Sequence, residues 1–164
     1  MKTQIQFDAA LAKIYDETRP ISGDECRASI REALQSVGRN PDAQLLDVGC
    51  GTGRVLETLI PQLFRAEQVV GVDISQAMID IARNKETLRD VDLQKISLSD
   101  FADKVENHQR FDIVICHWLF HCIPDWQPAL RACTRLARKS GILIWLNEDG
   151  DLYQVLDGLG AMPT

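Results

Sequence analysis

The sequence predicts an α/β fold in which a mostly parallel sheet is flanked by helices. From residue 43 onward, short apolar segments of strand length alternate with segments whose apolar residues recur at helical spacing. Such alternation is typical of parallel strands joined by right-handed helical crossovers. The first strand also runs into a glycine-rich turn and a helix between Leu45 and Val55. Ligands in folds of this class bind at the carboxyl ends of the strands.

Two helices are expected before the sheet. Apolar residues recur at helical spacing over residues 7–15, and the turn at Pro20 ends this first helix. Ser22 and Glu25 have the spacing of a capping box, which predicts a second helix that ends at Gly38. We therefore expect an amino-terminal helical cap over residues 1–40 and a ligand-binding domain over residues 41–164, together forming one structural domain.

The remaining elements follow the same alternation. Strands are expected at residues 43–48, 68–72, 91–96, 111–116 and 142–146, and helices at 53–60, 75–85 and 126–138. The segment 142–146 is apolar on both faces, as in an interior strand, yet only a weak helical pattern over residues 151–159 follows it. An uncovered apolar edge strand invites pairing. We expect a truncated chain, or a homodimer or partner protein that covers this edge.

Composition limits the classes of function. The chain has 164 residues, a net charge of −6 and 45% hydrophobic residues, which fits one domain with a sizeable core. Its one basic cluster, residues 131–139, falls in the last turns of a predicted helix, where cations offset the helix dipole, so no nucleic-acid partner is expected. We see no signal peptide or membrane span, and five cysteines fit reduced thiols; we therefore expect a cytoplasmic protein without a membrane partner.

The glycine turn predicts a small-ligand site. Gly49, Gly51 and Gly53 can adopt positive φ and allow a ligand to approach the backbone without a Cβ in the way. A dinucleotide fingerprint needs glycine at position 54, where this chain has arginine, and a phosphate-binding loop needs a Gly-Lys-Ser/Thr ending that the turn lacks. The spacing therefore disfavours a nucleotide-dependent oxidoreductase.

Two acids narrow the ligand further. Asp47 lies just before the glycines, where its carboxylate can accept hydrogen bonds from a cationic amine. Asp73 ends the second strand, at the spacing of a carboxylate that binds both hydroxyls of a ribose. We expect a ligand with a ribose and a cationic group. The alternative is a glycine turn that serves only tight packing, with Asp73 as a helix cap.

These residues resemble the class I S-adenosylmethionine-dependent methyltransferases. Residues 47–53 and 70–75 are similar to the first two motifs of that family, and residues 111–116 and 121–125 to its fourth strand and the following loop. The resemblance implies a Rossmann-like three-layer α/β/α sandwich with about five strands in the order 3-2-1-4-5. The family's terminal antiparallel strands are expected to be missing here.

The resemblance also implies an activity and a site. The expected activity is methyl transfer from S-adenosylmethionine to a small-molecule acceptor, with S-adenosylhomocysteine as product; the alternative is a non-catalytic or partner-dependent protein that binds the same cofactor. The glycines would line the methionine part of the cofactor, Asp73 would hold the ribose, and Asp47 would face the amino group. The cofactor-binding set also includes Tyr15, Arg19, Cys50, Ile74, Ser97, Leu98, Asp100, Cys116 and His117.

Several of these assignments have alternatives. The family commonly has Gly-Asp near the adenine, whereas this chain has Ile96-Ser97; Ser97, the backbone N–H of Leu98 or Asp100 would serve instead, or Asp100 caps a short helix. Arg19 would pair with the methionine carboxylate, or lie in solvent.

The segment after the fourth strand holds the catalytic candidate. Cys116, His117, His121 and Cys122 are too close together in sequence to wrap a zinc ion, so no metal is expected. Methyl transfer depends mainly on alignment of the two reactants, and a base is needed only when the acceptor must lose a proton. His121 is the candidate base.

Overall fold

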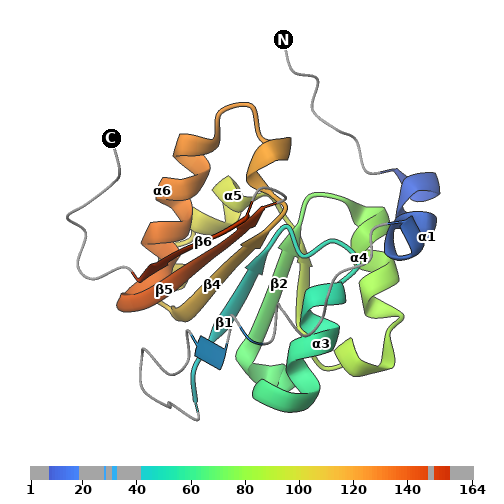
Figure 1. Cartoon of the computed structure of the whole chain (residues 1–164), viewed down its shortest axis with the longest axis horizontal. Helices are drawn as coiled ribbons and strands as arrows, with labels where there is room; N and C mark the ends of the chain where they lie inside the picture. The colour runs from blue at the N-terminus through green and yellow to red at the C-terminus, as the bar shows by residue number, and fades with distance from the viewer. Residues whose placement is uncertain (1–7, 19–27, 29–30, 33–41, 148–149, 156–164) are drawn as a thin grey trace.

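A computed structural model describes residues 8–18, 28, 31–32, 42–147 and 150–155 of the chain. Its single sheet has the strand order β3-β2-β1-β4-β5-β6, with β1 to β5 parallel and β6 antiparallel to β5 (Figure 1). The strands are β1 (Leu45–Val48), β2 (Val69–Asp73), β3 (Asp92–Lys95), β4 (Phe111–His117), β5 (Ala137–Asn147) and β6 (Gly150–Val155). The predicted parallel sheet and its order 3-2-1-4-5 are confirmed.

Helices cover both faces of the sheet and make the three-layer arrangement (Figure 1). The α-helices described are α1 (Ala9–Thr18), α3 (Arg54–Leu63), α4 (Gln76–Arg83), α5 (Leu98–Ala102) and α6 (Trp126–Leu136). Short 3₁₀ turns lie at η1 (Ala66–Gln68), η2 (Glu86–Leu88), η3 (Val105–Asn107) and η4 (Phe120–Cys122). One core layer holds residues of α3 and α4, the other holds residues of α5 and α6, and α1 lies beside α4.

The alternation of side chains in the strands builds the two core layers. In β1, Leu45 packs toward α3 and α4, whereas its neighbour Leu46 packs toward α5 and α6; both are fully buried. Burying a leucine side chain contributes about 1.5–3 kcal/mol. Because β1 lies in the middle of the sheet, its hydrophobic residues on both faces fix the position of the glycine turn that follows it.

Part of the amino-terminal prediction lies outside the described residues. The second helix, with its capping box at Ser22 and Glu25, falls almost entirely there, and the division at residue 40 stays a prediction. The first helix is α1, where the Asp8 carboxylate accepts hydrogen bonds from the backbone N–H groups of Ala10 and Leu11 at 3.0 and 2.9 Å.

The carboxyl-terminal prediction was wrong in one respect. Residues 150–155 form a strand, β6, and not a helix, so an antiparallel strand is present where none was expected. The register runs from Ile142 opposite Val155 to Asn147 opposite Gly150. Pairing satisfies the backbone donors and acceptors along this edge of β5, which a helix would leave open. The edge that we expected a partner to cover is therefore covered by the chain itself.

The boundary between α6 and β5 also differs from the prediction. The helix ends at Leu136 and β5 begins at Ala137, so Arg138 belongs to a strand and not to a last helical turn. The Arg138 guanidinium donates to the Asp112 carboxylate on β4 at 2.8 Å, and that carboxylate also accepts from the backbone N–H of Gln44 at 2.8 Å. This contact between strands replaces the predicted dipole interaction for Arg138.

Candidate functional site

The glycine turn after β1 is tied to the end of β2. The backbone N–H groups of Gly49 and Cys50 donate to the Val72 carbonyl at 2.8 and 3.1 Å. Gly49, Gly51 and Gly53 have φ of 72°, 55° and 76°, in the left-handed region that favours glycine. The predicted need for glycine at these three positions is confirmed by the backbone.

The three glycines meet different surroundings. A Cβ on Gly49 would lie 2.8 Å from a methyl group of Leu119, and one on Gly53 would lie 2.3 Å from a methyl group of Leu88. At Gly51 the nearest atom would be 4.0 Å away, in open space. Gly49 and Gly51 line the main cavity described below, but Gly53 does not. Gly53 permits close packing against Leu88 of η2, and its contact with the cofactor stays a prediction.

Asp73 anchors the turn from the end of β2. One carboxylate oxygen accepts from the backbone N–H of Gly51 at 2.9 Å, and the other accepts from that of Ser75 at 2.8 Å. Burial raises the pKa of this carboxyl group, and the backbone hydrogen bonds act in the opposite direction. A carboxylate has about four acceptor positions. Asp73 therefore holds the turn and still presents lone pairs to a ligand.

Asp47 is a buried carboxyl group beside this turn. Its side chain is 1% exposed, and its Oδ2 has no hydrogen-bond partner among the described residues. Burial is the larger cause that raises the pKa of Asp47 to about 7, and the negative charge of the nearby Asp73 is the smaller one. Asp47 lines a small cavity of about 30 Å³, together with Tyr15, Cys50, Arg54 and His117. Burial also raises the pKa of the Cys50 thiol, which keeps it neutral.

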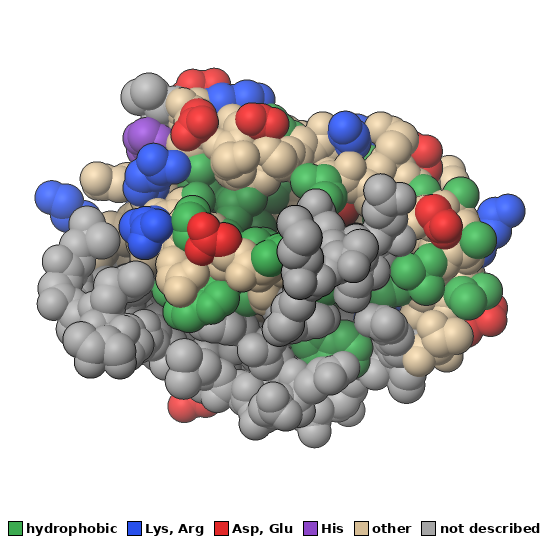
Figure 2. Space-filling model, turned by 90° about the horizontal axis from the view of Figure 1, so that it is seen from above, with side chains coloured by type: hydrophobic (Ala, Val, Ile, Leu, Met, Phe, Trp, Pro, Cys, Tyr) green, Lys and Arg blue, Asp and Glu red, His purple; other side chains and the backbone are tan. Residues whose placement is uncertain are grey.

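The main cavity lies at the carboxyl ends of the strands and has a volume of about 470 Å³. Viewed toward these strand ends, hydrophobic side chains gather around a hollow in the described surface (Figure 2). Of the residues predicted to bind the cofactor, the cavity is lined by Tyr15, Gly49, Gly51, Asp73, Ile74, Ser97, Leu98 and His117. The structure therefore brings together residues that are up to about a hundred positions apart in the sequence.

One wall combines an apolar side chain with the start of α5. Ile74 is 52% exposed, although it is a large hydrophobic residue, and it lies in the cavity wall. Ser97 caps α5: its hydroxyl accepts from the backbone N–H of Asp100 at 3.1 Å. Asp100 lies in the first turn of this helix and outside the cavity lining. The expectation that Asp100 caps a helix is wrong, because the cap is Ser97 and the helix starts at Leu98. A contact of Asp100 with the cofactor stays a prediction.

The end of β4 separates two predicted site residues. Cys116 is fully buried, with its Sγ 3.5 Å from that of Cys133 on α6, and it lines neither cavity. His117, one residue later, lines both cavities, because adjacent strand residues point to opposite faces. Its ring stacks on Trp118 at 5.4 Å between centroids, and Trp118 has φ of 49°. The side chain of Cys116 thus packs in the core against α6, and a contact of this residue with the cofactor stays a prediction.

Two predicted residues lie outside the described structure. Arg19 is one, and the side chain of His121 is the other; only the backbone of His121, within η4, is described. Across the part of the chain that the structure describes, no group of three or more His, Cys, Asp or Glu side chains is arranged to hold a metal ion. None of the described helices is long and apolar enough to cross a bilayer.

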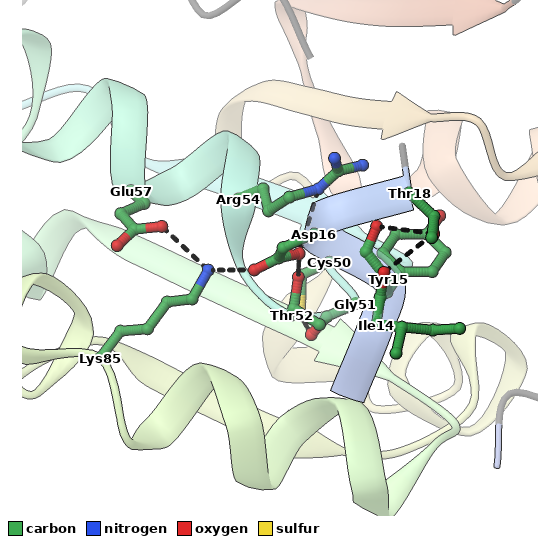
Figure 3. A network of polar contacts seen from close by, with 10 residues as sticks. All are labelled: Ile14, Tyr15, Asp16, Thr18, Cys50, Gly51, Thr52, Arg54, Glu57 and Lys85. Atoms are coloured by element: carbon green, nitrogen blue, oxygen red, sulfur yellow. Dashed lines mark hydrogen bonds and ion pairs between the residues drawn. The ribbon is translucent and has the colours of Figure 1, made fainter. Parts of the chain in front are cut away.

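A polar cluster that the sequence did not predict lies next to the cavity. Asp16 on α1 meets Thr52, Arg54 and Lys85, and Lys85 also meets Glu57 (Figure 3). These contacts join positions 28 to 69 residues apart. Helix α6 also contributes to the cavity, through Pro128, Ala129 and Ala132, and this contribution was not predicted from the sequence.

Comparison with known proteins adds family information to this geometry. Residues 46–145 match a family model described as "Methyltransferase domain". A ubiquinone biosynthesis O-methyltransferase from Alkalilimnicola ehrlichii is 31% identical over 155 residues, covering 90% of this chain and 60% of the relative. A protein of the same name from Coxiella burnetii is 33% identical over 101 residues, covering 62% of this chain and 42% of that protein. The chain thus spans only about half of these relatives' length.

Solved structures with low sequence identity share the fold. The plantazolicin methyltransferase BpumL, solved in complex with SAH, has a TM-score of 0.67 at 18% identity, covering 85% of this chain and 53% of that protein. The CurJ carbon methyltransferase has a TM-score of 0.66 at 19% identity, covering 84% of this chain and 38% of that chain. These likenesses support the arrangement of the sheet and helices.

Proposed function

The chain belongs to the methyltransferase domain family, and from this premise we propose that it binds S-adenosylmethionine and transfers its methyl group to a small-molecule acceptor. The observation that carries the proposal is the position of the Asp73 carboxylate. Its carboxylate is fixed by Gly51 and Ser75 at the rim of a cavity of about 470 Å³, beside the open face of Gly51. This is a suitable arrangement for a ligand with a ribose.

The surroundings fit the rest of this cofactor as well. The open space at Gly51 is a cradle that a Cβ would enter. The unpartnered Oδ2 of Asp47 supplies a buried anionic acceptor for an amino group. Ile74 and Leu98 offer apolar contact for a base, and Ser97 offers a hydroxyl. A negatively charged pyrophosphate would meet repulsion from Asp47 and Asp73, so a cationic ligand is favoured over a dinucleotide.

The acceptor would occupy the part of the cavity beyond the end of β4. His117, Trp118, Leu119 and Ile123 line this part, and they are mostly apolar or aromatic. When bound, the cofactor supplies an electrophilic methyl group, and this chain's residues contribute by orienting the acceptor and excluding water. The relatives' name supports an oxygen acceptor. Loss of the hydroxyl proton would then need a base. His121 stays our predicted base, and His117 is a second candidate because it lines the cavity.

Three predictions remain part of this proposal. Residues 1–40 would act as a cap over the cofactor, which is supported by Tyr15 of α1 in the cavity wall. A cytoplasmic location is proposed from the cysteine pattern of the sequence, whose five residues fit reduced thiols. A homodimer or partner protein would have to bind elsewhere than at this edge of β5, because β6 pairs with it.

Calorimetric titration with S-adenosylhomocysteine tests the cofactor site. Asp73→Ala should weaken binding by about 2–4 kcal/mol, because two charge-assisted hydrogen bonds are lost. Asp80→Ala is the matched control: it removes an exposed carboxylate of α4 that contacts only Gln76 in the described structure. Absence of binding to the unmodified protein would refute the cofactor. Equal affinity of both variants would refute the placement of the ribose.

Turnover separates catalysis from binding alone. Incubation with methyl-labelled S-adenosylmethionine and a panel of phenols and catechols should transfer label to an acceptor. Tight binding without transfer to any acceptor, in the presence or absence of added cell extract, would favour the alternative of a non-catalytic protein. Transfer only with extract would favour partner dependence.

A further inference from the structure

We propose that Asp16 is a positioning residue for the cofactor site, because it fastens α1 across the glycine turn and thereby holds Tyr15 in the cavity wall. This inference rests on the proposed function. It concerns the Asp16 cluster, which consists of Asp16, Thr52, Arg54, Glu57 and Lys85 (Figure 3). Asp16 comes from α1, Thr52 from the turn, Arg54 and Glu57 from α3, and Lys85 from the segment after α4.

The contacts of Asp16 converge from three directions. One carboxylate oxygen accepts a hydrogen bond from the Thr52 hydroxyl and lies 3.3 Å from Nε of Arg54. The other oxygen lies 2.8 Å from Nζ of Lys85, which is also 2.9 Å from the Glu57 carboxylate. Thr52 is itself only 1% exposed and belongs to the turn. A single side chain therefore ties α1 to the cofactor loop and to the end of α4.

The charges within the Asp16 cluster balance when α1 is in place. Arg54 and Lys85 bring two positive charges, Glu57 on α3 brings one negative charge, and Asp16 on α1 brings another. The side chains of Arg54 and Lys85 are only 13% and 16% exposed, so water compensates poorly if Asp16 is withdrawn. This distinguishes the cluster from surface pairs such as Arg89 with Glu86, which are 68% and 82% exposed.

Tyr15 links the position of α1 to the cofactor cavity. It precedes Asp16 on α1 and lines both cavities. The guanidinium carbon of Arg54 lies 5.0 Å from the centre of the Tyr15 ring, so the same arginine contacts both neighbours. Figure 3 shows Tyr15 and Asp16 on one helix with Arg54 beside them. Once the carboxylate is neutralised, α1 should leave this position more often, and a bound cofactor should lose one wall of its cavity.

Asp16→Asn is the direct test, because it keeps the size of the side chain and removes its charge. We expect S-adenosylhomocysteine to bind about tenfold more weakly, chiefly through faster dissociation in stopped-flow measurements, with a raised KM for the cofactor and a nearly unchanged kcat. Asp16→Glu keeps the charge and should restore affinity to within about threefold. Glu86→Gln, which breaks the exposed pair with Arg89, is the matched control and should change nothing.

Hydrogen exchange supplies a readout that needs no cofactor. Asp16→Asn should speed exchange of the α1 amides and of the amides of residues 51–54, while amides of α6 stay as slow as in the unmodified protein. If affinity and α1 exchange are both unchanged, or if α6 exchanges faster in step with α1, Asp16 has no positioning role and the inference is wrong. If the unmodified protein fails to bind S-adenosylhomocysteine, the proposed function fails instead, and the positioning of a cofactor by Asp16 is rejected with it.

Discussion

Substitution of Gly53 by alanine should destabilise the fold far more than the same substitution at Gly51. Both residues have positive φ, 76° and 55°, and an alanine in this region costs about 1–2 kcal/mol. At Gly53 the new Cβ would also lie 2.3 Å from a methyl group of Leu88 and 3.3 Å from the Cβ of Ala82. Because Leu88 is only 1% exposed, the overlap is relieved by shifting packed atoms, at about 1–3 kcal/mol.

The expected totals therefore differ in a measurable way. Gly53→Ala should lower the free energy of unfolding by about 2–5 kcal/mol, and Gly51→Ala by about 1–2 kcal/mol. Urea denaturation followed by circular dichroism measures both, and equal slopes with denaturant concentration would show that the comparison concerns the same unfolding transition. Binding should rank in the opposite order, because only Gly51 lines a cavity: its alanine variant should lose S-adenosylhomocysteine affinity at least tenfold.

A double mutant identifies the cause. If overlap with Leu88 produces the excess, combining Gly53→Ala with Leu88→Ala should cost less than the sum of the single substitutions, by about 1–3 kcal/mol. If the two substitutions lower the free energy of unfolding additively, the whole cost of Gly53→Ala comes from its backbone conformation. Equal destabilisation by the two glycine substitutions would refute the reasoning from packing altogether.

Other predictions concern acids and strain at the same site. Because burial raises the pKa of Asp47 to about 7, the folded state binds the carboxyl proton more tightly than the unfolded state does. The free energy of unfolding should therefore fall by about 2 kcal/mol as pH rises from 5 to 7. In Asp47→Asn this group is absent, so the urea midpoint of unfolding should depend less on pH. Affinity for S-adenosylhomocysteine should rise over the same pH range, since an amino group prefers the ionised carboxylate, and isothermal titration at pH 5.5 and 8 checks this. Trp118→Gly should relieve about 1 kcal/mol of backbone strain at φ of 49° but weaken acceptor binding, measured as KM for the acceptor.

Local signals in the sequence were sufficient for the turn and the sheet. The glycines at 49, 51 and 53 and the acids at 47 and 73 are specified by residue type and by strand ends, which depend on short segments. The opposite orientations of Cys116 and His117 were also accessible, because side chains alternate along a strand, but both were assigned to the cofactor. The contacts of the Asp16 cluster were not accessible, since they form only after distant elements pack.

The carboxyl-terminal strand was missed for a related reason. Strand β6 forms its hydrogen bonds with β5. The apolar run of β5 predicts an interior strand, whereas residues 150–155 predict a strand less strongly, because their pairing depends on the neighbouring strand. The packing at Gly53 was not predictable, because the atom that excludes a side chain there, a Leu88 methyl group, comes from a turn 35 positions later. Residue types indicated where the backbone needed glycine, but tertiary contacts decided which glycines line a cavity.

The two acids suggest why cofactor binding and folding should be coupled. Burial raises the pKa of both Asp47 and Asp73, and the charge of Asp73 raises that of Asp47 further, so the ionised pair opposes folding at neutral pH. A ligand with a cationic group would offset this repulsion, and its ribose hydroxyls would donate to Asp73. Binding to the folded state alone would then stabilise the chain, by about 2.7 kcal/mol at a hundredfold excess over Kd. A neutral nucleoside such as adenosine would keep the contacts with Asp73 but lack the cation, so it should bind more weakly and give less stabilisation at the same concentration, most clearly above pH 7, where Asp47 is ionised.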